Sequence, residues 1–62
     1  MKNTHRLRST SPAHTRALVD GLAASGYHSI VRVVDGETCI IVAAPDHVVA
    51  MAENATTWRM LL

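Results

Sequence analysis

The strongest constraint on the fold is the segment SIVRVVDGETCIIVA, residues 29–43, in which two runs of β-branched residues flank Asp35-Gly36. The Asp-Gly dipeptide tolerates positive φ at both central positions of a turn. It therefore favours a type I′ turn, whose twist matches that of the strands it joins. The segment predicts a β-hairpin in which Val34 faces Glu37, and the same register continues outward along both strands.

Side chains alternate along a strand, so this hairpin has two faces with different chemistry. One face is suited to a core, and it collects Tyr27, Ser29, Val31, Val33, Thr38, Ile40 and Val42. The other face places Ile30 opposite Ile41 and Arg32 opposite Cys39. Its full set is His28, Ile30, Arg32, Val34, Glu37, Cys39, Ile41 and Ala43.

The residues before the hairpin predict a helix from about Pro12 to Ser25. Ser11 can cap the free amides at the start of this helix. Pro12 suits the first helical position, because the N–H that proline lacks would have no partner there. Gly26 can end the helix in a left-handed conformation. These signals agree on both ends of the helix.

The residues after the hairpin predict a second helix that begins near Asp46 and ends at Asn54. The Asp46 carboxylate is favourable near the positive end of the helix dipole. Apolar residues recur at helical spacing and predict a buried stripe. The stripe consists of Val48, Met51, Ala52 and Ala55.

The chain ends predict two weaker strands. Residues 3–9, NTHRLRS, can form a first strand, and residues 56–62, TTWRMLL, alternate as in a final strand. We expect an α+β two-layer sandwich of order (β)αββα(β), with an antiparallel sheet and two helices on one face. With both end strands this is the ferredoxin-like order. We divide the chain into a basic arm or weak first strand, residues 1–10, and one α+β domain, residues 11–62.

The size of the chain predicts an association. Chains of about 60 residues bury only about 60% of the surface that their unfolded form exposes, so their stability is marginal. One cysteine allows no intrachain disulfide. The sheet face opposite the helices has an apolar centre with charges around it, as interfaces have. We therefore expect a homodimer or another protein on a partner face of Ile30, Arg32, Val34, Cys39 and Ile41. The alternative is that the hairpin has another register or that the ends of the chain fold over this face, and either would make Ile30 and Ile41 part of the core.

Charge is unevenly distributed and leads to a second hypothesis. Residues 1–16 contain four basic side chains and no acidic one, whereas the remaining residues contain five acidic side chains and two arginines. Such asymmetry is typical of an arm that binds nucleic acid or an acidic partner. The alternative function is therefore nucleic-acid binding through Lys2, Arg6, Arg8 and Arg16. The predicted open face has no aromatic residue on which RNA bases could stack.

No pattern in the sequence predicts catalysis, a cofactor or a metal. The four histidines, His5, His14, His28 and His47, are separated by 9, 14 and 19 residues, without the short spacing of metal ligands. The acidic residues are scattered, and no glycine-rich phosphate loop occurs. Cys39 lies in mid-strand, where a thiol usually acts as a small hydrophobic residue. A ligand- or metal-binding module and a ribonuclease that uses His28 are the remaining alternatives.

No apolar run approaches the roughly 18 residues of a membrane span, and the basic N-terminus is not followed by the apolar segment of a signal peptide. We therefore expect a cytoplasmic protein without a membrane partner. Taken with the preceding features, the sequence predicts a non-enzymatic, homodimeric binding or regulatory module. It would be an inhibitor or adaptor that acts by protein–protein contact.

Overall fold

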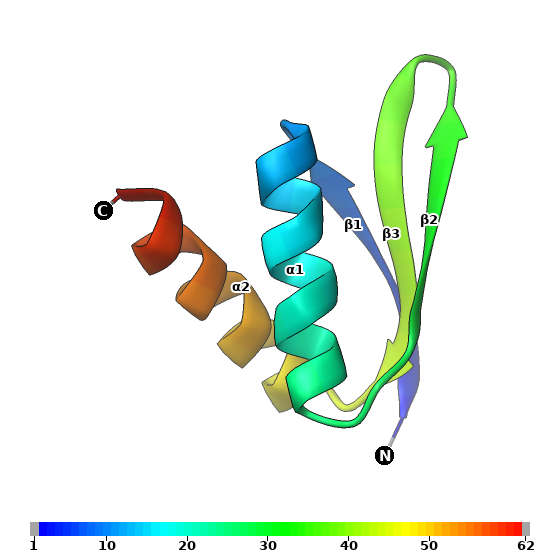
Figure 1. Ribbon diagram of the computed structural model, residues 1–62. Helices are drawn as coiled ribbons and strands as arrows, with labels where there is room; N and C mark the ends of the chain where they lie inside the picture. Colours follow the sequence, from blue (N-terminus) through cyan, green and yellow to red (C-terminus); the bar gives the residue numbers. More distant parts are fainter. Residues whose placement is uncertain (1, 62) are drawn as a thin grey trace.

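The computed structural model describes residues 2–61 of the chain. Its elements are β1 (Asn3–Ser9), α1 (Pro12–Ala24), β2 (Ser29–Val34), β3 (Glu37–Ala44) and α2 (Asp46–Leu61). The strands form one antiparallel sheet of order β1-β3-β2. Both helices lie on the same side of this sheet, and α2 diverges from the sheet toward its C-terminal end (Figure 1). The predicted α+β class is therefore confirmed, and a helix, a hairpin and a second helix follow one another as predicted.

The β2–β3 hairpin has the predicted register. Val34 pairs with Glu37 and Arg32 pairs with Cys39. Asp35 has a φ of 52° and Gly36 a φ of 79°, so both turn residues are in the left-handed region that a type I′ turn requires. The register predicted from the Asp35-Gly36 turn is therefore confirmed.

Helix α1 begins and ends close to the predicted positions. The Ser11 hydroxyl accepts a hydrogen bond from the His14 N–H at 3.1 Å, and Pro12 is the first helical residue. At the other end Gly26 has a φ of 87°, and its N–H donates to the carbonyl of Ala23 at 2.9 Å. This hydrogen bond satisfies a carbonyl of the last turn, which explains why the helix ends there.

Residues 3–9 form β1, which pairs with β3 rather than standing apart as an arm. Arg6 lies beside Ile41 and Arg8 beside Cys39. The start of β1 is tied to α2 by Asn3, whose side-chain amide donates to an Asp46 carboxylate oxygen at 2.9 Å. Arg6 and Arg8 of the predicted arm are thus built into the sheet.

The predicted fourth strand is wrong, because residues 56–61 continue α2. Thr57 donates its hydroxyl to the carbonyl of Glu53 at 3.0 Å, as a helical threonine does, and Asn54 does not end the helix. Continuing the helix satisfies the backbone locally and keeps Thr56 buried. The described residues therefore have the order βαββα, and the ferredoxin-like order is not confirmed. Met1 and Leu62, at the ends of the predicted arm and the predicted final strand, lie outside the described residues.

The core lies between the helices and one face of the sheet. Its largest fully buried side chains are Leu18, Leu22, Ile40 and Val42. Helix α2 is rotated relative to its predicted stripe: Val49 and Thr56 are buried, whereas Met51 is 65% exposed. Val48 and Ala52 of the predicted stripe are buried as expected, and α2 meets a small residue of α1 at Ala52. A Cβ placed on Gly21 would lie only 3.7 Å from the Cβ of Ala52.

Candidate functional site

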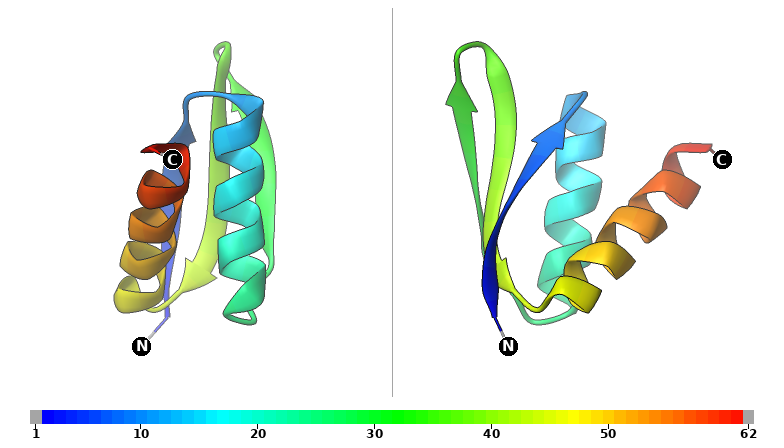
Figure 2. Two further views of the ribbon diagram at one scale, coloured as in Figure 1. Left: turned by 60° about the vertical axis from the view of Figure 1, so that its left-hand side comes forward. Right: turned by 180° about the vertical axis from the view of Figure 1, so that it is seen from behind.

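The side of the sheet opposite the helices carries no other element among the described residues (Figure 2). We call this side the open face. The strand register and the alternation of side chains define its members. They are Thr4, Arg6 and Arg8 on β1, Glu37, Cys39, Ile41 and Ala43 on β3, and Ile30, Arg32 and Val34 on β2.

Three arginines lie in two rows across the open face. In one row Arg8 and Arg32 flank Cys39, and in the next row Arg6 and Ile30 flank Ile41. All three arginines are exposed. The carboxylate of Glu37 is the acidic group of this face, and it lies 3.4 Å from the guanidinium of Arg8. Both side chains of this ion pair are more than half exposed, so it contributes little to stability. The open face keeps a positive excess.

The apolar part of the open face is only partly covered. Ile30 is 56% exposed and Val34 is 40% exposed, whereas Cys39 is 5% exposed. Cys39 is a free thiol covered at the centre of the sheet, between the two arginines that flank it. Because arginine can lay its aliphatic stem along apolar surface, the flanking side chains suit this covering role. Ile30 is not part of the core of this chain.

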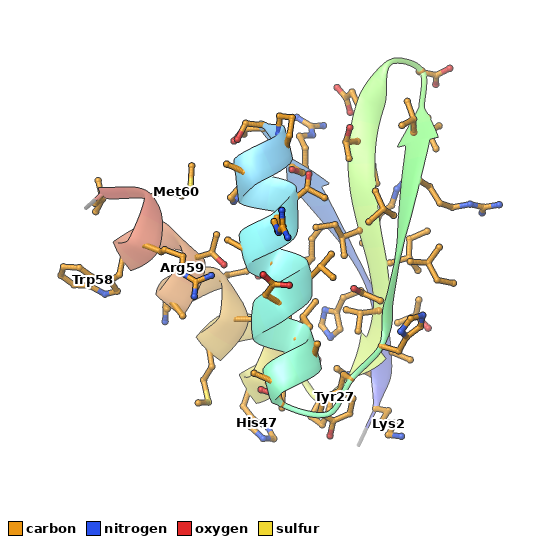
Figure 3. The ribbon with its side chains drawn as sticks, in the orientation of Figure 1. Lys2, Tyr27, His47, Trp58, Arg59 and Met60 are labelled. Atoms are coloured by element: carbon orange, nitrogen blue, oxygen red, sulfur yellow. The ribbon has the colours of Figure 1, made fainter. Side chains whose placement is uncertain are left out.

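The structure brings together residues that the sequence had assigned to different sites. Arg6 and Arg8 of the predicted arm share the open face with the predicted partner face, Ile30, Arg32, Val34, Cys39 and Ile41. The other two basic residues lie elsewhere. The ammonium of Lys2 is 5.7 Å from the centroid of the Tyr27 ring (Figure 3), and Arg16 lies on α1. The alternation Thr4, Arg6, Arg8 was the signal that could have placed the arginines together, given the pairing of β1 with β3.

A second surface feature lies on the helix side. A groove of about 850 Å³ separates the N-terminal half of α1 from the hairpin, and Val19, Val31 and Val33 supply its apolar lining. Val31 is 48% exposed and Val33 is 71% exposed, although both belong to the predicted core face. The tip of the hairpin extends beyond the N-terminal end of α1 (Figure 1). The side of β2 that faces the helices is therefore partly exposed along this groove.

The histidines are dispersed in the structure as in the sequence. His5 lies 3.0 Å from the Asp46 carboxylate, and His14 accepts a hydrogen bond from the Thr10 N–H at 3.1 Å. His28 and His47 are exposed. Within residues 2–61, histidine, cysteine and acidic side chains form no group of three or more that could hold a metal ion.

The hydrogen bond from Asn3 holds the pKa of the Asp46 carboxyl below its usual value of 3.8, and the charge of nearby His5 acts in the same direction. Asp46 is exposed, so this pair serves mainly to join β1 to the start of α2. Neither Asn3 nor Asp46 belongs to the open face.

No protein-family model, curated protein or solved structure matches this chain. Neither helix within residues 2–61 is long and apolar enough to span a membrane. Function is therefore inferred from the chemistry of the open face.

Proposed function

We propose that this chain is a non-enzymatic binding module whose open face receives an acidic, partly apolar segment of another protein. The supporting observation is that one uncovered sheet face carries three arginines, Arg6, Arg8 and Arg32, together with the exposed side chain of Ile30. Apolar anchors surrounded by arginine are typical of protein interfaces. Regulation by contact, as in an inhibitor or adaptor, is the role that such a module would serve.

The charges of the open face select the kind of partner. Guanidinium groups bind carboxylates through two parallel hydrogen bonds, which are stronger than neutral ones. An acidic segment would meet three arginines and a single carboxylate, Glu37. Its aliphatic side chains would cover the exposed parts of Ile30 and Val34, which contributes roughly half of the ~1.5–3 kcal/mol that full burial of such a side chain is worth. Charge and apolar contact thus favour the same partner.

A second copy of the chain is a poor partner for this face. Packing two open faces together would bring the arginines of both copies, three on each, into one interface with only two glutamates. Like charges placed against each other cost several kcal/mol of binding free energy, which opposes this contact. A homodimer therefore requires a surface other than the open face.

Nucleic-acid binding is the second candidate, because Arg6, Arg8 and Arg32 could also neutralise phosphates. The convergence of the three arginines favours it. The open face, however, has no aromatic side chain for base stacking, and its exposed Ile30 and Val34 have no counterpart in a phosphate backbone. We therefore rank it below an acidic protein segment.

A random-peptide library displayed on phage tests the proposal. We expect peptides selected on the wild-type protein to be rich in Asp and Glu next to aliphatic residues. Arg32→Glu should weaken their binding about tenfold or more, because it removes one charge-assisted contact and adds a repulsive one. Arg59→Glu makes the same change of charge at an exposed site on α2, outside the open face, and should leave binding unchanged.

The proposal is rejected if the selected peptides lack acidic residues or bind Arg32→Glu as well as wild type. A labelled DNA duplex and a single strand, measured at about 50 and 200 mM salt, test the second candidate. Tight binding that falls steeply with salt and requires Arg32 would replace the protein partner by nucleic acid. Circular dichroism of each variant verifies that the fold is retained.

A further inference from the structure

We infer that a second copy of this chain pairs with β2 along its free edge and joins the two sheets into one. The inference does not depend on the proposed function, because it concerns a different surface. The sheet order β1-β3-β2 leaves β2 with one unpaired side. No element lies beyond β2 on that side among residues 2–61 (Figure 1).

The two edges of the sheet differ in how they resist pairing. Strand β1 carries Arg6 and Arg8, and charged side chains are a common protection of an edge strand. Strand β2 carries Arg32 as its single charge, with no proline. Its apolar side chains are exposed on both faces of the sheet, and they are Ile30, Val31, Val33 and Val34. A long, apolar and unprotected edge is a template for another strand.

The hairpin determines which backbone groups of β2 point outward. In a hairpin with a two-residue loop, the pair next to the turn, Val34 and Glu37, is hydrogen-bonded. Hydrogen-bonded and non-hydrogen-bonded pairs alternate along an antiparallel ladder. The backbone groups of Val34 and Arg32 therefore point toward β3, and those of Val31 and Val33 point toward the free edge. These outward groups are the ones that a further strand would bind.

Charge selects one register for a symmetric pair of β2 strands. A two-fold axis perpendicular to the sheet pairs residues of the same face, and the two registers that pair most of β2 place the axis beside Arg32 or beside Val31. Beside Arg32, the arginine would lie directly opposite the partner's Arg32 in a close pair, which is repulsive. Beside Val31, Val31 faces the partner's Val31, and Arg32 faces the partner's Ile30. The second register avoids the repulsion and keeps the same number of paired residues.

A second copy fits this edge better than an unrelated strand does. The edge carries no acidic side chain that would select a basic partner, and the Val31 register places Val31 of one copy against Val31 of the other while it keeps the two Arg32 side chains apart. The small size of the chain also makes an added interface valuable. In the pair, both open faces would lie on the same side of a six-stranded sheet, since each copy contributes three strands.

Sedimentation equilibrium tests the pairing. We expect the wild-type protein to form a dimer and Val33→Lys to shift it to monomer. Each copy would then carry a lysine in the strand that forms the contact, and both charges would have to lie within the interface. Val33 is 71% exposed, so this change should not disturb the fold of one copy. Trp58→Lys is the matched control, with a similar exposure of 69% on α2, and should remain dimeric. A wild type with the mass of a single chain at millimolar concentration would overturn the inference. Dissociation by Trp58→Lys but not by Val33→Lys would overturn it too.

Disulfide trapping tests the register. In a Cys39→Ala background, Val31→Cys should form a covalent dimer on mild oxidation. Opposed residues of a hydrogen-bonded pair lie about 5.5 Å apart between Cα atoms, within the range that a disulfide can bridge. Val33→Cys should not form this dimer, because it faces the partner's Ser29. Efficient trapping by Val33→Cys and none by Val31→Cys would reject the proposed register.

Discussion

Arg8 and Arg32 come from opposite ends of the sheet order and lie on either side of the same β3 residue, Cys39. One arginine belongs to the basic N-terminal segment and the other to the hairpin. Cys39 is 5% exposed, in a sheet face that neither helix of residues 2–61 covers. The two side chains thus flank the centre of the sheet and supply part of the positive charge on which the proposed function depends.

The first prediction concerns the protection of this thiol. Arg8→Ala together with Arg32→Ala should raise the rate at which a thiol reagent labels native Cys39 several-fold, because both covering stems are removed. Labelling followed by absorbance measures this rate. Arg16→Ala together with Arg59→Ala removes the same charge from the helices and should leave the rate unchanged. Equal rates in the two double variants would show that the arginines do not shield Cys39.

The second prediction concerns Gly21 in the middle of α1. Gly21→Ala should raise the free energy of unfolding by about 0.5–1 kcal/mol, because alanine loses less conformational entropy in a helix. The added Cβ would meet Ala52 at 3.7 Å, an ordinary contact distance. Gly36→Ala is the matched control and should destabilise, because Gly36 has a φ of 79°. Urea unfolding compares the variants, and a loss of stability in Gly21→Ala would mean that the helices are packed more tightly than described.

The third prediction separates the two faces of the sheet. Ile40→Val should lower the free energy of unfolding by about 0.5–1.5 kcal/mol, because Ile40 is fully buried and the lost methylene leaves a cavity. Ile30→Val removes the same group from a side chain that is 56% exposed and should cost less than about 0.5 kcal/mol. Urea unfolding of dilute protein measures both. Equal costs would place Ile30 inside a core.

The fourth prediction concerns stability in acid. Because the Asn3 hydrogen bond lowers the pKa of Asp46 in the folded state, the stabilisation is present above about pH 3.8. It is lost as the pH falls through the lower, folded-state pKa. Asn3→Ala should reduce this loss of stability below pH 3.8, since the main cause of the lowered pKa is removed. Unfolding free energy measured against pH tests the effect. Thr4→Ala, on the other face of β1, is the control and should retain the wild-type profile.

Local signals in the sequence predicted the hairpin and α1 well. The Asp35-Gly36 turn set the β2–β3 register, and Ser11, Pro12 and Gly26 marked the ends of α1. Each of these features depends on the conformational preference of one or two residues and on their immediate neighbours. Such preferences act in any context, so they can be read without knowledge of the rest of the chain.

Features of α2 were less predictable. The alternation in residues 56–62 resembled a strand, but Thr56 is buried in a continuing helix. The stripe of α2 was also misplaced, since Met51 is exposed and Val49 is buried. Helix α2 approaches Gly21 of α1 closely at Ala52. That approach joins residues about thirty positions apart, and no local pattern records it.

The sequence alone determined the α+β fold class, the hairpin and the chemistry of the side chains, because these follow from nearest-neighbour preferences and from composition. Only the tertiary structure decided that Arg6 and Arg8 share a face with Arg32, because this depends on β1 pairing with β3. It also left Val31 and Val33 exposed on β2, because β2 is an edge strand of the sheet. Long-range pairing, which combines weak local tendencies into one arrangement, created both surfaces on which the proposals depend.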